Sequence, residues 1–359
     1  MLKFDEKIYA MWLSNIYRIR VIHIKKLLDY FKSFENIYNS TKFELIKLEI
    51  PDKIINQIVE NKDLTYILEK TYLLEKWNIN YVVYGMKNYP SNLTLIQQPP
   101  KRLYYIGLLP SEDKKKLAVV GSRNYSPYGK IVTESFVREL SKFNVEIISG
   151  MAKGIDSIAH YASLTEKNNT YAVLGCGVNV VYPKDNLILY NNIIKCGGII
   201  SEYEPTKTPE TYMFPYRNRL IVGLADALLV TEANLKSGAL ITVDYALEQS
   251  KEVYVIPSRI TDEKGMGSNQ LLQQGARIVL TPKDILEEMS DTFKIKTYLN
   301  EKEEFIYNFI TKTPIHLEEL IQKTKLPFND IVENLSNLLV KGIVIVDNSN
   351  YYVRNKEIL

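Results

Sequence analysis

The sequence predicts an α/β protein whose central part is a Rossmann-like, doubly wound and mostly parallel sheet, and three observations support this. From about Leu117 to Leu280, short apolar runs alternate with longer segments of helical periodicity. The runs are almost continuously apolar, as strands are when helices cover both faces of a parallel sheet. Several runs end in glycine or serine just before a helical segment, which is where open sheets of this class bind ligands.

Length and composition set limits before any motif is considered. The 359 residues are enough for two or three domains, and 46% hydrophobic with 24% charged residues is typical of soluble globular proteins. Lys and Arg number 45 against 42 Asp and Glu, so any strongly basic surface must be local. The two cysteines, Cys176 and Cys196, are spaced neither as a zinc motif nor as a disulfide framework.

The N-terminal region is predicted to be a domain of short helices, residues 1–66. Apolar residues recur at helical spacing in YAMWLSNI, IKKLLDYF, FELIKL and KIINQIV. The region has neither the basic-then-apolar order of a signal peptide nor an apolar run of the roughly 18 residues that a membrane span needs. We therefore expect a cytoplasmic protein that does not enter a membrane.

The central domain, residues 67–289, contains the predicted sheet. Two short strands at NINYVVYG and RLYYIG come first, separated by proline-marked turns. The seven strands that follow are LAVVG, VEIISG, YAVLG, GGIISE, ADALLVTEA, EVYVIP and RIVLT. The helical segments between them are YGKIVTESFVRELSKF, DSIAHYASLTEKN, NLILYNNIIKC, RNRLIVGLA, GALITVDYALEQS and SNQLLQQG. The order of the strands in the sheet does not follow from the sequence.

The C-terminal region, residues 297–357, is predicted to be a winged-helix domain behind the charged spacer MSDTFKIKTYLNEKEE. Three helical segments, EEFIYNFITK, HLEELIQKT and DIVENLSNLLVKG, precede two alternating runs joined by the polar turn DNSN. Many winged helices bind duplex DNA through the third helix, but this one is acidic to neutral and has no arginine. Docking of another protein is at least as well supported as DNA binding.

The end of the first central strand supplies candidate binding residues. Gly121 permits a tight turn and close approach of a backbone, Ser122 can donate from its hydroxyl, and Arg123 can hold a phosphate through two N–H groups. Ser126 and Pro127 follow as the cap and first residue of a helix. Taken alone, the segment is equally compatible with a plain turn whose arginine pairs with a carboxylate.

Other strand ends repeat this chemistry and favour an anion site. SGMAKGID places Lys153 among small residues, with Asp156 or Ser157 positioned to cap a helix. GCGVNVVYP has glycines, and SEYEP offers Glu202 and Glu204, which we expect to orient nearby cations. LKSG places Lys236, Ser237 and Gly238 before a helix that begins near Ala239. Loops from neighbouring strands should converge at one edge of the sheet.

A further candidate is the segment YMFPYRNRLIVGLA. It places Arg217, Asn218 and Arg219 at the start of a predicted helix, after the aromatic residues Tyr212, Phe214 and Tyr216. Positive charge at a helix N-terminus opposes the macrodipole and calls for an anionic partner. Aromatic rings beside guanidinium groups suit a surface that stacks bases and holds a nucleic-acid backbone. The alternative is that the rings pack in the core and Arg217 forms a salt bridge.

Motifs for other chemistry are absent. GSRNYS has one glycine where the dinucleotide-binding motif GxGxxG needs three, and no GxxxxGK[ST] P-loop occurs. The three histidines, His23, His160 and His316, lie one in each predicted domain and support neither a metal site nor a Ser-His-Asp triad. We expect no cofactor and no metal, and we expect His160 to be a packing residue.

Taken together, the motifs resemble the DprA/Smf family of DNA-processing proteins. The blocks GSRNYSPYG, ISGMAKGIDSIAH, YAVLGCGVNVVYP, SEYEP, FPYRNRLIVGLADALLVTEANLKSGALITVDYALEQSKEVYVIP and GSNQLLQQGA occur in the family's order between about Tyr81 and Leu280. The helical N-terminal domain, SAM- or HhH-like in the family, and the winged-helix tail also fit the family's three-part layout.

The resemblance implies a homodimer that is not an enzyme, binds single-stranded DNA during natural transformation, protects it and loads the RecA recombinase onto it. The strand-binding residues that it implies are Gly121, Ser122, Arg123, Gly150, Lys153, Gly154, Arg217, Asn218, Arg219, Lys236, Ser237 and Gly238. Family members dimerise through the C-terminal part of the Rossmann-like domain, which implies Leu271 and Leu272 as dimer contacts.

Two points leave alternatives open. The family often has a glycine-rich hairpin in its helical domain, but YRIRVIHIKK stands there, so DNA binding is not assigned to this domain. A related Rossmann-like group cleaves nucleoside monophosphates at the glycosidic bond with a PGGxGTxxE motif. Here LKSGALITVDY lacks the double glycine and the spaced glutamate. Such an enzyme, or a nucleotide-sensing protein that ignores single strands, is the alternative function.

Overall fold

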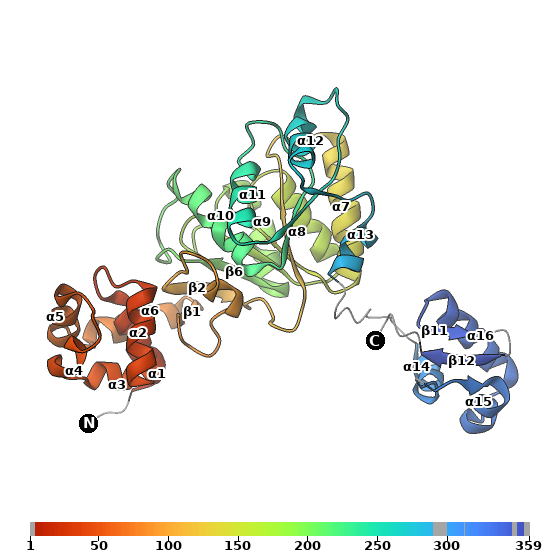
Figure 1. Ribbon diagram of the computed structural model, residues 1–359, viewed down its shortest axis with the longest axis horizontal. Helices are drawn as coiled ribbons and strands as arrows, with labels where there is room; N and C mark the ends of the chain where they lie inside the picture. The colour runs from red at the N-terminus through yellow and green to blue at the C-terminus, as the bar shows by residue number, and fades with distance from the viewer. Residues whose placement is uncertain (1–3, 290–299, 312, 347–349, 355–359) are drawn as a thin grey trace. The chain divides into compact units, whose positions relative to one another are not determined.

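The structure is a computed structural model that describes residues 4–289, 300–311, 313–346 and 350–354. They form two compact units, one of residues up to 282 except 142–144, and one of those three residues and residues from 283 onward (Figure 1). Most of the predicted spacer, the predicted domain start at 297 and most of the turn DNSN lie outside the described residues. The division into three domains stays a prediction.

The N-terminal region is helical, as the sequence predicts. Its helices are α1 (Glu6–Asn15), α2 (Val21–Phe31), α3 (Phe34–Asn39), α4 (Lys42–Ile46), α5 (Asp52–Glu60) and α6 (Thr65–Lys76). In the turn between α1 and α2, where the resemblance predicts a glycine-rich hairpin, Arg18 has φ +60°. This left-handed conformation favours glycine, so the turn is present although the glycine is not. The Arg18 guanidinium lies 5.2 Å from the ring centre of Tyr17.

The sheet is mixed and mostly parallel, which confirms the predicted fold class. Its strands are β1 (Asn80–Val83), β2 (Arg102–Gly107), β3 (Lys116–Val120), β4 (Glu146–Ser149), β5 (Thr170–Val173), β6 (Gly198–Ser201), β7 (Ala227–Val230), β8 (Glu252–Val255) and β9 (Arg277–Ile278). The order is β1-β2-β6-β5-β4-β3-β7-β8-β9. The seven neighbouring strands β6-β5-β4-β3-β7-β8-β9 are parallel to one another, while β2 is antiparallel to both β1 and β6.

This order creates a topological switch point between β3 and β7. After β3 the chain adds β4, β5 and β6 on one side, and it then crosses to add β7, β8 and β9 on the other. The loops that leave β3 and β7 at their carboxyl ends therefore diverge to opposite faces of the sheet and open a crevice between them.

Helices cover both faces of the sheet. The connecting helices are α7 (Pro127–Lys142), α8 (Ile155–Thr165), α9 (Leu187–Cys196), α10 (Met213–Leu224), α11 (Ala239–Glu248) and α12 (Met266–Gln273). Helices α8 and α9 contact each other and one part of the sheet, and α10 and α11 form a second contacting pair. Successive side chains of β5 point to opposite faces of the sheet and into two separate hydrophobic cores. Ala172 belongs to one core, and Tyr171 and Val173 belong to the other.

The helical region and the sheet are joined by a polar cluster around Glu204. Arg102 Nη2 lies 2.5 Å from the Glu204 carboxylate, and Lys70 Nζ and the Tyr104 hydroxyl each lie 2.9 Å from it. Arg102 Nη1 also donates to Ser14 Oγ at 2.9 Å. Burial acts to raise the pKa of Glu204, but Arg102 and Lys70 hold it below its usual value. Because these residues come from α1, α6, β2 and the loop after β6, the cluster fastens the helices to the sheet.

The C-terminal unit has the winged-helix arrangement. It contains α13 (Pro282–Glu288), α14 (Glu301–Phe309), α15 (Leu317–Thr324) and α16 (Phe328–Val340), with the strands β10 (Ile315–His316), β11 (Val344–Val346) and β12 (Tyr351–Arg354). The strands form an antiparallel sheet in the order β10-β12-β11. Helix α16 is the third helix of the predicted winged-helix domain, the one through which many winged helices bind duplex DNA. Its side chains Phe328, Val332 and Val340 are exposed. Among the described residues, no helix is long and apolar enough to cross a bilayer.

Candidate functional site

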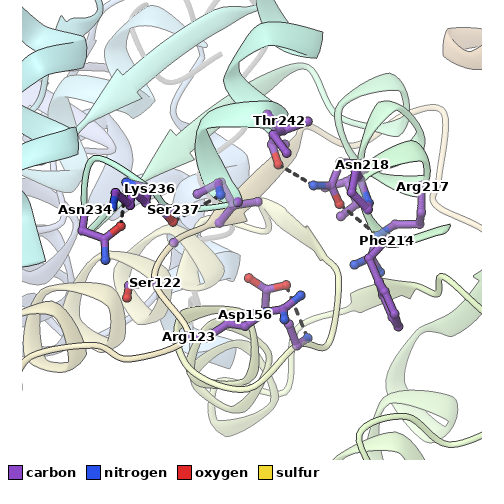
Figure 2. A pocket seen from close by; sticks show the side chains of 18 of the residues that line it. Ser122, Arg123, Asp156, Phe214, Arg217, Asn218, Asn234, Lys236, Ser237 and Thr242 are labelled. Carbon is purple, nitrogen blue, oxygen red and sulfur yellow. Dashed lines mark hydrogen bonds between the residues drawn. The ribbon is translucent and has the colours of Figure 1, made fainter. Parts of the chain in front are cut away.

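A cavity of about 400 Å³ lies at the switch point, beyond the carboxyl ends of β3 and β7 (Figure 2). Its volume falls in the range of roughly 300–1,000 Å³ that small-ligand sites occupy. The walls come from the β3–α7 loop, the β4–α8 loop, α10, the β7–α11 loop and the first turn of α11. The polar and aromatic lining residues are Ser122, Arg123, Asn124, Asp156, Phe214, Arg217, Asn218, Asn234, Lys236, Ser237 and Thr242.

The β3–α7 loop is held in place by Glu232, which follows β7. The Ser122 backbone N–H donates to the Glu232 carbonyl at 2.7 Å, and the Ser126 N–H donates to its carboxylate at 3.0 Å. Ser126 Oγ accepts from the Gly129 N–H at 3.0 Å, so Ser126 caps α7 as the sequence predicts. Glu232 is 1% exposed and was not identified from the sequence, although a glutamate at the end of an apolar strand was a usable signal.

Two glycines interlock the β3–α7 and β4–α8 loops. A Cβ on Gly121 would lie 2.7 Å from Ile155, so the space beside this glycine is filled by protein. Gly121 nevertheless lines the pocket, so the sequence interpretation, in which it lets a ligand backbone come close, stays a prediction. Gly154 has φ +90°, and a Cβ there would lie 2.3 Å from the Ser122 carbonyl oxygen. The two loops converge, as the sequence predicts.

Two exposed cations line the pocket. The side chains of Arg123 and Lys236 are both exposed, and neither has an ion pair or side-chain hydrogen bond among the described residues. They come from the β3–α7 and β7–α11 loops on the two sides of the switch point. Figure 2 shows Lys236 beside Asn234 and Ser237, and Arg123 beside Asp156. Unpaired cations in such a crevice attract an anion from solution.

The β7–α11 loop contributes Lys236, Ser237 and Gly238. Ser237 Oγ accepts from the Ala239 N–H at 3.2 Å, so this serine supports the start of α11. No atom lies within 4 Å of a Cβ placed on Gly238. In contrast to Gly121, this glycine leaves open space at the pocket.

Asp156 lies at the pocket and fixes the β4–α8 loop. Its Oδ2 accepts from the Gly150 N–H at 3.1 Å and from the Ala152 N–H at 3.4 Å. The predicted capping role for Asp156 is wrong, because α8 begins one residue before it and the carboxylate reaches back to the loop. Burial raises the pKa of Asp156, whereas Arg217 and the two amides act to lower it.

Arg217 forms the floor of the pocket. Because α10 begins at Met213, the argument that placed Arg217 at a helix N-terminus is wrong. The side chain is buried, and Nη1 donates to the carbonyls of Gly150, at 2.9 Å, and of Val173. Burial lowers the pKa of Arg217 to about 10, and nearby Asp156 acts in the opposite direction. Asn218 lies beside it and accepts from Arg217 Nε at 3.0 Å.

Arg219 does not reach the pocket. Its Nη2 pairs with Glu202, and its guanidinium lies 4.1 Å from the ring centre of Tyr216. Glu202 therefore binds Arg219, while Glu204 binds Lys70 and Arg102 instead of a pocket cation. Each glutamate does pair with a nearby cation, as expected. These cations, however, are not among the residues that line the pocket.

Lys153 also lies outside the set of pocket-lining residues. Its Nζ pairs with Asp185, and the two side chains are 61% and 70% exposed. His160 is a packing residue, as predicted, with Nδ1 at 2.7 Å from Thr170 Oγ1. Burial lowers the pKa of His160 to about 3.

Of the two leucines predicted as dimer contacts, one is buried and the other partly buried. Leu271 is 7% exposed and belongs to the core that includes Val253 and Val255 of β8, and Leu272 is partly buried against the same core. Their role as dimer contacts stays a prediction. Exposed apolar side chains in the same stretch of chain include Ile260, Met266 and Ile278.

The fold and the pocket together define a Rossmann-like protein with cations around a pocket at the switch point of its sheet. The chain belongs to the family described as DNA recombination-mediator protein A, whose model matches residues 80–290. This span covers more than half of the 359 residues and includes all strands of the large sheet and the whole pocket. The resemblance found in the sequence is thereby confirmed.

Relatives and solved structures agree with this assignment. The DNA processing protein DprA of Bacillus subtilis is 37% identical over 214 residues, which cover 59% of this chain and 72% of that protein. The X-ray structure of DNA processing protein A from Streptococcus pneumoniae has a TM-score of 0.64 and 32% identity, covering 80% of this chain and 99% of that one. A Helicobacter pylori DNA processing protein A, described for its single-stranded DNA binding mode, has a TM-score of 0.53 and 30% identity over 60% and 97%.

Proposed function

We propose that this protein binds single-stranded DNA in the pocket at the switch point and acts there as a recombination mediator. The observation that carries the proposal is a pair of exposed cations on the two sides of one pocket, Arg123 and Lys236, which have no ion pair within the described part of the chain. Cations in this arrangement suit the phosphates of a backbone that passes between them. The single-stranded DNA binding described for the Helicobacter pylori relative supports the same ligand.

The shape of the site favours a single strand over a duplex. A cavity of about 400 Å³ lined by two exposed cations and by the buried Arg217 admits a single nucleotide, with its base turned inward. A duplex keeps its bases paired and stacked, so entry would require base flipping at a cost of a few kcal/mol. A flexible single strand enters the pocket without that cost.

We propose binding without catalysis. The pocket carboxylate Asp156 uses Oδ2 to hold the Gly150 and Ala152 amides, which leaves it poorly placed to activate a water. Incubation with nucleoside monophosphates should release no free base. Measurable release that disappears in Asp156→Asn would instead establish the glycosidic-hydrolase alternative.

The test of DNA binding is fluorescence anisotropy with an oligo-dT strand at several salt concentrations. Arg123→Ala and Lys236→Ala should each weaken binding and reduce the log-log salt slope by about 0.7, the value for one phosphate contact on single strands. Arg138→Ala is the matched control, because Arg138 is an exposed arginine about 16 Å along α7 from its first residue. Binding that is insensitive to salt and equal in all three variants would refute the pocket assignment.

The proposed cellular role is to protect incoming single strands and load the RecA recombinase onto them, as a cytoplasmic homodimer. The family description as a recombination mediator supports this role. The protein should slow nuclease digestion of oligo-dT and speed assembly of RecA on strands coated with single-strand-binding protein, and Arg123→Ala should lose both effects. Normal RecA assembly with Arg123→Ala would separate RecA loading from the pocket. Sedimentation should give twice the mass of 41.5 kDa.

A further inference from the structure

An aromatic pair adjoins one end of the pocket. Phe214, in the first turn of α10, lines the pocket, and its ring centre lies 5.2 Å from that of Tyr182 with 33° between the ring planes. Figure 2 shows Phe214 at the end of the pocket that holds Arg217 and Asn218, away from Lys236. Tyr182 is 45% exposed, so the pair extends from the pocket onto the surface.

Packing explains one ring of this pair and leaves the other unexplained. A Cβ on Gly175 would lie 2.8 Å from Phe214 Cδ1, so the Phe214 ring covers the glycine at the end of β5. Among the described glycines, none is covered by Tyr182 in this way. Its ring contacts Phe214 and is 45% exposed to solvent. A large exposed ring beside a candidate binding pocket is typical of a ligand contact.

A cation lies next to the aromatic pair. Lys153 Nζ pairs with Asp185, which follows Tyr182 by three positions, so this cation lies beside the segment that holds the exposed ring. Lys153 precedes Gly154, where a Cβ would lie 2.7 Å from Arg123 Cα. Backbone packing and the ion pair thus link Arg123, Lys153 and the segment of Tyr182.

We propose that Phe214 and Tyr182 form a stacking platform for the base of a second nucleotide, next to the nucleotide in the pocket. Lys153 binds the phosphate of that second nucleotide in exchange for Asp185. The inference rests on the proposed single-strand binding, because the platform has no ligand without a strand. Stacking on aromatic rings accepts every base, since every base has a π face, so the platform adds affinity without sequence preference.

The test compares Tyr182→Ala and Tyr182→Phe on two strands of equal length, oligo-dT and an abasic strand. Tyr182→Ala should weaken oligo-dT binding roughly tenfold, as is usual for loss of one stacking ring, and leave the abasic strand unaffected. Tyr182→Phe keeps the ring and should bind like the wild type. The salt slope should not change, since no phosphate contact is removed. A 2-aminopurine base in the strand should be quenched by the wild type and not by Tyr182→Ala.

Each outcome separates the two proposals. If the wild type binds oligo-dT and Arg123→Ala weakens that binding, but Tyr182→Ala binds both strands like the wild type, the platform is wrong and the pocket assignment stands. Equal weakening of both strands by Tyr182→Ala also overturns the platform, because the contact would not involve bases. If the wild type binds neither strand, the proposed function fails and the platform fails with it.

Discussion

Replacing Asp185 with asparagine should strengthen single-strand binding. In the structure Asp185 forms an ion pair with Lys153, and a phosphate must displace this carboxylate before it can bind the lysine. Both side chains face solvent, at 61% and 70% exposure, so water and salt screen their attraction. Exposed pairs of this kind shift an equilibrium by a factor of about five at most, and Asp185→Asn should therefore tighten binding about two- to fivefold. The gain should shrink as salt rises.

The assay is anisotropy with oligo-dT at low and high salt, with three companion variants. Lys153→Ala should bind more weakly than the wild type, and the double variant should match Lys153→Ala, because Asp185 acts only through the lysine. Glu319→Gln is the control, since Glu319 pairs with Lys323 in the C-terminal unit at similar exposure. If Asp185→Asn binds no better than the wild type, or still helps when Lys153 is absent, the exchange mechanism is wrong.

The remaining predictions concern the pocket glycines, the buried pair behind the pocket and pH. Gly238→Val should weaken DNA binding at unchanged stability, because its side chain would enter open space, whereas Gly121→Ala should cost about 1–3 kcal/mol of unfolding free energy through overpacking. Arg219→Met should lower the unfolding free energy by about 3 kcal/mol, because it leaves Glu202 buried without its partner, yet oligo-dT affinity should be unchanged. His160 has a folded pKa of about 3 against 6.5 unfolded. Stability should therefore fall as pH drops below 6.5, by about 2 kcal/mol at pH 5, and urea titration by tryptophan fluorescence should show that His160→Gln removes this loss.

Much of the sheet could be predicted from the sequence because its signals are local. Each central strand is a short apolar run, and each observed strand lies within or at most one residue outside its predicted segment. The start of α10 was missed because Pro215 falls in its first turn, where proline is tolerated since the N–H has no helical partner. Strand β10 has two residues, too few for an alternating pattern.

The site could be predicted only in part because side-chain direction depends on where α10 begins. Arg217 and Arg219 are two residues apart, which is about 200° around a helix, so they point to opposite sides. One lines the pocket and the other pairs with Glu202. The convergence of the loops was predictable because parallel strands end at a common edge. The pairing of Lys153 with Asp185 was not, since it joins residues 32 positions apart, one in a loop and one in a single turn of 3-10 helix.

The interlocked glycines of the first two loops have a consequence for binding kinetics. Because Gly121 rests against Ile155 and Gly154 against the Ser122 carbonyl, neither loop has room to rearrange separately when a ligand arrives. The backbone of these two loops is thus preorganised, and it loses little entropy on binding. Association should then be limited by encounter and steered by charge, with no slow conformational step on the protein, and differences among strands should appear in their dissociation rates.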